Sequence, residues 1–247
     1  MRFEIYRESL LEMFKKLLVG RIFSTTTIIQ TEGTIFSIDE WRRHRQVFRY
    51  AKFYPEWFEE ITQETDAVVI DIAKASRLVK LAPRHTKIIV EKRGSKLCFT
   101  DDDGTTNLHY EEPEKPLMTQ LPFEIKPLDV VFTLDLAELK DIAKSGDKMK
   151  TTEYRFAIRD DQVLVNIEDP KDDRNEITRL LNSSEIISGT DLDTYFLYGI
   201  SDIARTFQEE TFTVHTSTHS PGWFTEGCRH LGYEIGVLVP TFPSTSP

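Results

Sequence analysis

One arrangement of apolar and polar positions recurs four times along this chain. Each copy begins with a short alternating stretch, continues with an amphipathic segment of about three helical turns, and ends in further alternating stretches. Alternation with period two is typical of half-buried strands, whereas apolar positions three and four residues apart are typical of a helix with one buried face. The copies begin near residues 3, 67, 129 and 194, so their spacings are 64, 62 and 65 residues. This regularity predicts a repeated unit of strand, helix and paired strands.

Each of the four predicted helices carries a narrow apolar stripe, as expected for a helix that lies on a sheet. The stripes consist of Leu10, Phe14 and Leu17; of Ala75, Leu78 and Ala82; of Leu136, Leu139 and Ala143; and of Ile200, Ile203, Ala204 and Phe207. The third helix, over residues 137–146, is predicted to be short.

Turn-forming residues separate the alternating stretches that follow the helices. They lie at 93–95 (Arg-Gly-Ser), 159–161 (Arg-Asp-Asp) and 170–173 (Pro-Lys-Asp-Asp). Gly, Asp and Pro favour tight turns. The stretches that they join are therefore predicted to form antiparallel hairpins.

The segment between the second and third copies is rich in proline. Residues 111–129 contain four prolines, which cannot donate to a helix or a sheet ladder and so favour an extended connection. We predict an α+β fold of two similar domains, residues 1–112 and 128–247, joined by a linker over residues 113–127.

Composition narrows the class of protein. An apolar fraction of 39% with 16 Phe residues is enough for a folded core. No apolar run reaches the roughly 18–20 residues of a membrane span, and charged residues interrupt the first 16 positions, so neither a membrane segment nor a signal peptide is expected. Two cysteines favour a reducing compartment. We expect a protein of the cytoplasm, or of the nucleus in a eukaryote.

Positive charge gathers on the predicted helices although the net charge is −10. The basic positions are Lys15 and Lys16 on the first helix, Lys74, Arg77 and Lys80 on the second, Lys140, Lys144 and Lys148 on the third, and Arg205 on the fourth. Repeated basic helices suit the phosphate backbone of a nucleic acid, which Lys and Arg contact whatever its sequence. The alternative is that these residues are only the solvated faces of helices, and acidic neighbours on the third helix favour that alternative there.

With these features, the sequence resembles proliferating cell nuclear antigen (PCNA) and the archaeal sliding clamps. The resemblance extends over the whole chain as a pattern. It is clearest over residues 194–240, which include Pro221 at the start of a strand and the pair Val239-Pro240 at the end of another. Residues 75–90 and the strand that follows the proline-rich linker are similar to the same family.

The resemblance implies a function without catalysis, cofactor or metal. Members of the family form a ring of three subunits that encircles double-stranded DNA independently of its sequence, that a clamp loader opens, and that tethers DNA polymerase and other proteins through a short clamp-binding peptide. The positions that match the DNA-facing helices are the basic residues named above. No interaction with a membrane is expected.

The resemblance also implies two protein-binding surfaces. The groove for the partner peptide matches Ile38, Leu121, Phe123, Pro221, Val237, Val239 and Pro240. The edges that join neighbouring subunits match Asn107, Leu108, His109, Tyr110 and Glu111 in one domain and Ile177, Thr178, Arg179, Leu180 and Leu181 in the other.

Three alternatives remain open. The chain could be a subunit of a heterotrimeric or checkpoint-type clamp, an α+β enzyme, or a scaffold that does not bind DNA. The sequence has no phosphate-binding loop, dinucleotide fingerprint or nucleophile elbow. His215, His219, Cys228 and His230 are read as surface residues and not as a metal site, and residues 101–104 (Asp-Asp-Asp-Gly) as a turn and not as a calcium loop. The basic segment 41–45 and the aromatic segment 54–58 fit a divergent member of the family, archaeal or viral.

Overall fold

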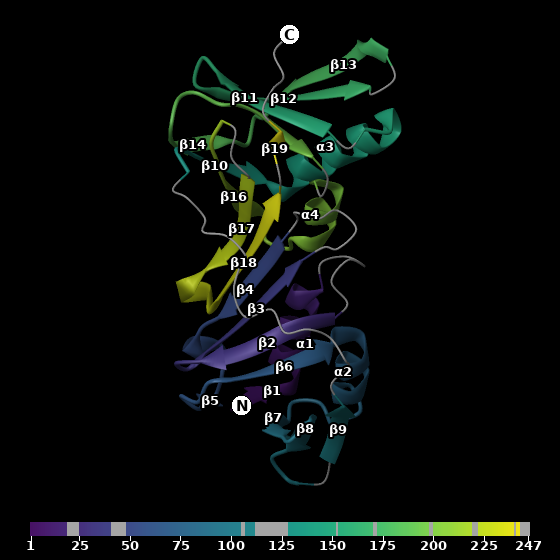
Figure 1. The fold of residues 1–247 in the computed structure, drawn as a ribbon, viewed down its shortest axis with the longest axis vertical. Coiled ribbons are helices and arrows are strands. Elements are labelled where there is room, and N and C mark those ends of the chain that lie inside the picture. Colours follow the sequence, from purple (N-terminus) through teal and green to yellow (C-terminus); the bar gives the residue numbers. More distant parts are fainter. Residues whose placement is uncertain are drawn as a thin grey trace. The chain divides into compact units, whose positions relative to one another are not determined.

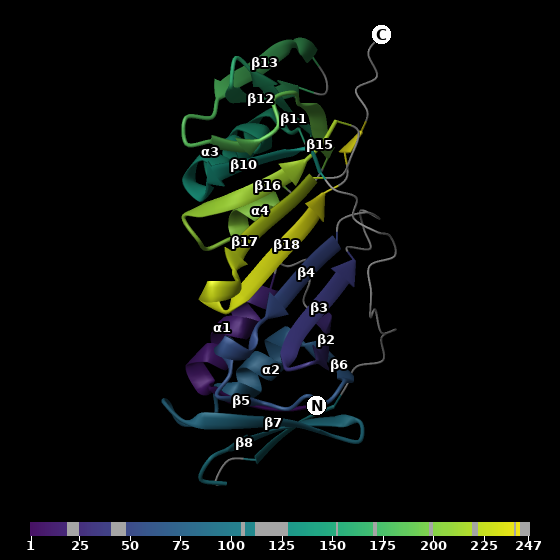
Figure 2. The ribbon, with the colours of Figure 1, turned by 90° about the vertical axis from the view of Figure 1, so that its left-hand side faces the viewer.

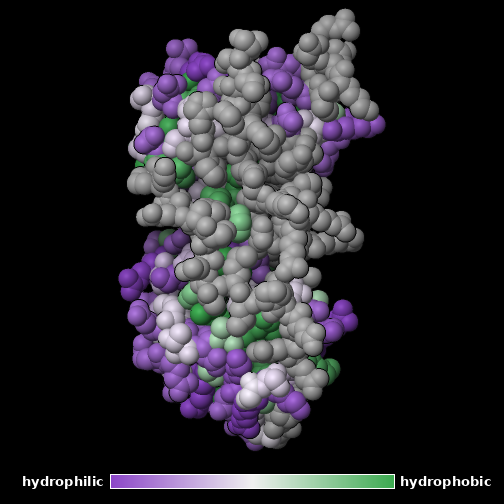
Figure 3. Space-filling model, in the orientation of Figure 1, coloured by the Kyte–Doolittle hydropathy of each residue, from purple (hydrophilic) through white to green (hydrophobic). Residues whose placement is uncertain are grey.

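A computed structural model of the chain describes residues 1–18, 25–40, 48–104, 107–111, 128–151, 153–169, 172–197, 200–218, 222–239 and 241–242. The predicted starts of the four opening strands and of the four helices are confirmed within one residue, whereas the second helix ends at Val79, three residues before its predicted end. Each predicted apolar stripe lies in a core, with Leu78 alone half-buried. Where described residues reach the surface in Figure 3, most of them are hydrophilic.

The chain divides into two compact units, and the first consists of Met1–Asp39, Arg49–Phe123 and Gly227–Ile235. Its elements are β1 (Arg2–Tyr6), α1 (Arg7–Leu17), β2 (Thr25–Thr31), β3 (Thr34–Glu40), β4 (Phe48–Phe53), the 3-10 turn η1 (Pro55–Trp57), β5 (Glu60–Ile61), β6 (Asp66–Asp71), α2 (Ile72–Val79), β7 (Lys87–Arg93), β8 (Lys96–Asp101) and β9 (Asn107–Glu111). One antiparallel sheet has the order β5-β1-β7-β8-β9, and a second set of neighbours has the order β4-β3-β2-β6.

The two helices of the first unit pack against each other, as Figures 1 and 2 show. The helix α1 buries Leu10, Phe14 and Leu17, and α2 buries Ile72 and Val79. These side chains repeat at helical spacing, so each helix has one apolar face and one face left to solvent.

The second unit consists of Glu40–Phe48, Glu124–Glu226 and Gly236–Pro247. Its elements are β10 (Val130–Asp135), α3 (Leu136–Met149), β11 (Glu153–Arg159), β12 (Gln162–Asp169), β13 (Asp172–Leu180), β14 (Glu185–Ser188), β15 (Asp193–Leu197), α4 (Ile200–Thr206), β16 (Thr211–Thr216), β17 (Gly222–Cys228) and β19 (Thr241–Phe242). One antiparallel sheet has the order β13-β12-β11-β15-β19, and a second set of neighbours has the order β14-β10-β16-β17. The helices α3 and α4 pack against each other.

The sequence did not predict how chain segments are exchanged between the units. The predicted linker lies outside the described residues, as does the turn at 170–171. The first unit includes residues 227–235, with the 3-10 turn η2 (Arg229–Leu231), and β18 (Tyr233–Val239) contributes residues to both units. Tyr233 shows why residues 227–235 belong to the first unit, because its ring packs 5.5 Å from Trp57 and 6.5 Å from Phe53 between ring centroids.

The prediction of a short third helix is wrong. The helix α3 has 14 residues, and its buried face continues through Ile142 to Gly146. Gly146 does not end the helix: a Cβ there would lie 2.1 Å from the hydroxyl oxygen of Tyr154, so the missing side chain lets α3 approach β11. The helix ends at Lys150, which has the left-handed conformation with φ of 58°.

The predicted hairpins at 93–95 and 159–161 are confirmed. Gly94 has φ of +63°, and Asp160 and Asp161 have φ of 50° and 57°, the pair of positive values that a two-residue turn needs to match the strand twist. Within the described residues, no helix has the length and apolar character to cross a membrane.

Candidate nucleic-acid interface

The helix α2 presents an unbroken basic face. The side chain of Asp71 accepts a hydrogen bond from the backbone N–H of Lys74 at 2.9 Å and so caps the start of the helix. With Ile72 and Val79 in the core, Lys74, Arg77 and Lys80 are exposed. Within the described part of the chain, none of these three side chains forms an ion pair, so all three are available to an anionic partner.

Arg7 holds the far end of α2 in place. Its Nε donates to the carbonyl oxygen of Val79 at 3.3 Å, and its Nη2 donates to that of Lys80 at 3.0 Å. The last carbonyls of a helix have no partner within the helix, so this arginine satisfies two of them. The basic face is therefore built on a helix that is fixed at both ends.

The helix α3 presents lysines and acidic residues together. Lys140, Lys144 and Lys148 are exposed, as predicted. Lys144 Nζ lies 2.9 Å from Asp141 Oδ1, and the side chains of both residues are more than half exposed. The hydrogen bond from Lys144 and its positive charge lower the pKa of Asp141 below its ordinary value. Its carboxylate is therefore charged at neutral pH.

The helix α1 differs from the prediction at one of its two lysines. Lys15 is exposed and lies 3.6 Å from Glu12. Lys16 is only 5% exposed, and its Nζ lies 3.8 Å from the centre of the Tyr233 ring, a contact in which the ring face stabilises the cation. The assignment of Lys16 to a DNA-facing surface is wrong in this conformation, because the side chain is in the core. The side chain of Arg205 on α4 lies outside the described residues.

The two predicted subunit edges are edge strands. Both β9 and β13 stand at one end of their sheets. Two of the predicted contact residues are instead core residues: Tyr110 is 4% exposed and its hydroxyl accepts the Asp71 backbone N–H at 2.5 Å, and Leu181 is 2% exposed. Leu180 is 37% exposed, Thr178 and Arg179 are exposed and Ile177 is half-buried. The side chains of Asn107, Leu108, His109 and Glu111 lie outside the described residues.

The predicted peptide groove stays a prediction. Leu121, Phe123, Pro221 and Pro240 lie outside the described residues. Ile38, Val237 and Val239 are at most 5% exposed, so these three side chains are core residues and not an open surface in this conformation.

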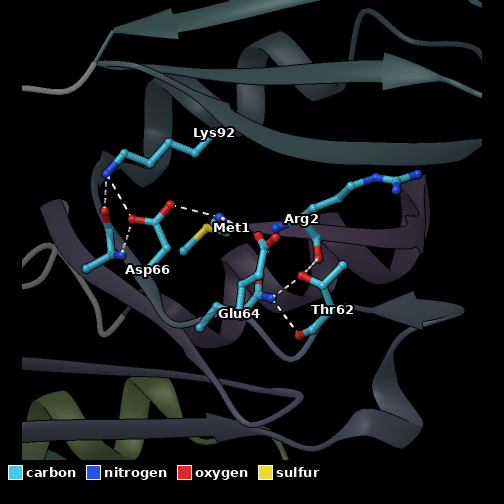
Figure 4. A network of polar contacts seen from close by, with 8 residues as sticks. Met1, Arg2, Thr62, Glu64, Asp66 and Lys92 are labelled. Carbon is cyan, nitrogen blue, oxygen red and sulfur yellow. Dashed lines mark hydrogen bonds and ion pairs between the residues drawn. The ribbon is translucent and has the colours of Figure 1, made fainter.

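Sequence reasoning missed a polar network around the start of β1 (Figure 4). The Met1 ammonium donates to Asp66 Oδ2 at 2.8 Å, and Lys92 Nζ lies 3.2 Å from Asp66 Oδ1 and 2.5 Å from the carbonyl oxygen of Ala67. Burial raises the pKa of Asp66, but hydrogen bonds from the ammonium, the Ala67 N–H and Lys92 outweigh burial and lower it. This network is a brace between strands, since it joins β1 and β7 of one sheet to β6 of the other.

A second missed cluster is a buried ion pair. Arg49 Nη2 contacts Asp39 Oδ2 and donates to Thr26 Oγ1 at 2.7 Å, and Arg49 is fully buried. Asp39 is 2% exposed and also accepts from the Thr26 hydroxyl. Burial lowers the pKa of Arg49, while the charge of Asp39 raises it. The pair connects β2, β3 and β4, and it is a structural feature because no open surface reaches it.

The described residues do not form a metal centre. No group of three or more His, Cys, Asp or Glu side chains among them is placed to hold a metal ion. Cys228 Sγ lies 3.3 Å from His230 Nδ1, but His215 lies on β16 in the other unit and His219 is outside the described residues. The basic helices are thus the surface that best fits a charged partner.

The fold defines the class of protein. Each of the two units has an adjacent helix pair and antiparallel strands, one of which lies at the edge of a sheet. This is an α+β clamp fold, and solved structures agree with it over almost the full chain. PCNA from Entamoeba histolytica has a TM-score of 0.78 at 12% identity, with 98% of each chain covered. PCNA from Thermococcus kodakaraensis has a TM-score of 0.75 at 14% identity, covering 98% of this chain and 99% of that one.

A third solved structure is that of A. fulgidus PCNA bound to the C-terminal region of FEN-1, with a TM-score of 0.75, 12% identity and 99% of each chain covered. No family model matches the sequence, and no curated protein matches it. At 12–14% identity the agreement is one of fold. The chain has the fold of the PCNA sliding clamps.

Proposed function

We propose that this protein is a DNA sliding clamp, a ring of three copies that encircles duplex DNA and tethers replication and repair proteins to it. The observation that carries the proposal is the agreement with PCNA over 98–99% of the chain. The exposed basic face of α2 supports it, because such a face attracts phosphates without reading bases.

Assembly of the ring rests on the edge strands β9 and β13. An unpaired strand edge is a ready template for another chain, and a closed head-to-tail ring covers all such edges. The exposed side chain of Leu180 on β13 adds an apolar contact at one of these edges. By this proposal the protein acts as a tether, with a clamp loader and peptide-bearing enzymes as partners.

We propose a short peptide as the binding partner, because a protein of the same fold was solved with a peptide region bound. The A. fulgidus PCNA was solved with a C-terminal region of FEN-1, and a short peptide of that kind is the partner class that we propose for the predicted groove. Titrating such a peptide, labelled with a fluorophore, against the protein tests this part. Loss of binding in L121A/F123A with an unchanged oligomer is the expected result, and unchanged binding would place the groove elsewhere.

Topological linkage to DNA is the decisive test of the clamp function. A duplex is anchored to beads at one end, the protein is threaded over the free end, and that end is then blocked with streptavidin. A ring should withstand a wash with 1 M NaCl, an experimental condition that removes contacts made only through charge, and it should be released when the duplex is cut.

The controls separate a ring from ordinary DNA binding. The same duplex left open at its free end should retain no protein after the wash. Equal loss from open and blocked duplexes would overturn the proposal, because a protein held by charge alone does not distinguish the two.

A further inference from the structure

The helices α2 and α3, both predicted to face DNA, differ in net charge. Residues 72–80, which comprise α2 and its C-cap, contain Lys74, Arg77 and Lys80 and no acidic residue, a formal charge of +3. Residues 136–150, which comprise α3 and its C-cap, contain four lysines and three acidic residues, a formal charge of +1. The helix α2 is therefore more basic than α3, and only α3 has acidic residues among its basic ones.

The acidic residues of α3 share the exposed surface of its lysines. Asp141 and Asp147 are exposed, as are Lys140, Lys144 and Lys148. The Asp141 carboxylate lies 2.9 Å from Lys144 Nζ. Screening at physiological salt acts over about 8–10 Å, so a phosphate that reaches Lys144 also experiences the charge of Asp141.

We infer that α2 supplies most of the attraction to the phosphate backbone of duplex DNA, and that Asp141 weakens the contact of α3 by engaging Lys144. This inference rests on the proposed clamp function and adds that α2 and α3 contribute unequally to DNA binding. Phosphate contacts release counterions only where positive charge is uncompensated. The exposed face of α2 meets that condition, and the centre of the α3 face does not.

For a clamp, the consequence is that α2 binds the DNA backbone strongly and α3 binds it weakly. A helix whose central lysine is already paired gains little when it meets a phosphate and loses little when it leaves. Asp141 is thus a residue that keeps DNA affinity low on one helix, which favours movement along the duplex over fixed binding.

Matched charge variants test the inference. K74Q/R77Q/K80Q removes three charges from α2, and K140Q/K144Q/K148Q removes three from α3. Binding to a fluorescein-labelled duplex is measured by anisotropy across a series of NaCl concentrations. Each lost phosphate contact lowers the slope of log K against log [NaCl] by about 0.9. We expect the α2 variant to lose about two contacts for each bound subunit and the α3 variant to lose fewer than one.

The single variant D141N tests the residue itself. It should raise DNA affinity about two- to five-fold at low salt and steepen the salt slope, because Lys144 then acts with its full charge. In a K144Q background this gain should fall by at least half. An undiminished gain in that background would overturn the role of the Asp141–Lys144 pair.

Controls keep failure of the inference distinct from failure of the clamp function. R2Q/R93Q, which alters two exposed residues on β1 and β7, reports the effect of charge loss away from the helices, and melting temperatures and native masses confirm folding. Equal losses from α2 and α3 in a protein that still links topologically to DNA would overturn the inference alone. A wild-type protein that neither links to DNA nor binds it with salt dependence would overturn the proposed function.

Discussion

The carboxylate of Asp193 on β15 is held by two arginines of the neighbouring strand β11. Arg155 donates to both of its oxygens, with two N–O distances of 2.7 Å, and Arg159 lies 3.7 Å away. A fork of this kind fixes the orientation of the carboxylate as well as its charge. The hydrogen bonds from Arg155 lower the pKa of Asp193, and its burial opposes them only in part.

This contact predicts a loss of stability in acid. A carboxylate whose pKa is lower in the folded state stabilises the fold above its unfolded value of 3.8, and that contribution disappears as the pH falls through the lowered folded value. D193N should cost about 1 kcal/mol of unfolding free energy at pH 7 and progressively less below pH 3.8. Urea unfolding at several pH values measures this difference.

The matched control is D161N. Asp161 lies in the β11–β12 turn at φ of 57°, a conformation that Asn tolerates. A cost for D193N that stays constant between pH 7 and pH 2 would contradict the assignment, because the ion pair would then contribute nothing specific to the charged state.

A substitution at a buried hydroxyl is predicted to stabilise the protein, in contrast to D193N. Thr194 is fully buried, and its Oγ1 has no hydrogen-bond partner within the described residues. Thr194→Val removes the unpaired hydroxyl at nearly constant shape and should stabilise the protein by about 1 kcal/mol. Thr26→Val makes the same change where the hydroxyl bonds to Arg49 and Asp39, and it should destabilise by about 1–3 kcal/mol. Denaturant midpoints that move in the same direction would refute the contrast.

The sequence did not predict which charged side chains are buried. Lys16 was read as solvated because a lone charged residue in a helical pattern is usually at the surface, and nothing in the sequence singled out Arg49 as buried. Their partners explain the exceptions: Tyr233 is far from Lys16 in sequence, and Asp39 meets Arg49 only when β3 and β4 are in place. Periodicity along one segment carries no information about such partners.

At the scale of elements, the start of α3 is tied to the loop after the edge strand β13. The Glu138 carboxylate accepts the backbone N–H groups of Asn182 at 3.0 Å and Ser183 at 3.1 Å, and it also contacts the Ser183 hydroxyl. Ser183 Oγ in turn accepts the backbone N–H of Asp135, the N-cap of α3, at 3.1 Å. The end of β13 therefore moves with the helix.

Breaking this tie should loosen the edge strand. E138Q keeps the size of the side chain but removes the charge, so its hydrogen bonds to the loop become weaker. We expect a cost of about 1–2 kcal/mol and faster amide hydrogen exchange at residues 181–184. D141N, on the exposed face of the same helix, should leave that exchange unchanged; faster exchange in both variants would show a general effect on α3.

Elements were predictable from the sequence where one face is buried, and less so where a close contact determines their length. The strands beginning near 3, 67, 129 and 194 and the four apolar stripes follow from periodicity alone. The extent of α3 does not, because Gly146 is a helix breaker by propensity and a contact residue in the fold. The order of strands in the sheets also lies beyond a pattern that describes each strand separately.

At the scale of the whole molecule, the proposed ring depends on an edge that carries Leu180. L180D places a charge on that edge strand, where a head-to-tail contact would bury it at high cost. Light scattering at micromolar concentration should give about 86 kDa for the wild type, three times the 28.7 kDa of one chain, and a monomer for L180D.

Another exposed leucine provides the control. Leu231 is 47% exposed on the turn η2, which is not part of either predicted subunit edge, so L231D should leave the native mass unchanged. Dissociation by both variants, or by neither, would exclude β13 as the subunit edge. A wild-type monomer would redirect the proposal to a ring built with other chains.

The exchange of segments between the units sets a schedule for biosynthesis. The aromatic group of Phe53 and Trp57, like Lys16, is completed by Tyr233, which the ribosome adds long after β9. At about 5–20 residues per second, the first unit waits on the order of ten seconds with that apolar surface open. The nascent chain is therefore a client for chaperones during this interval, and a premature stop before residue 233 yields a product with an exposed hydrophobic surface that favours aggregation.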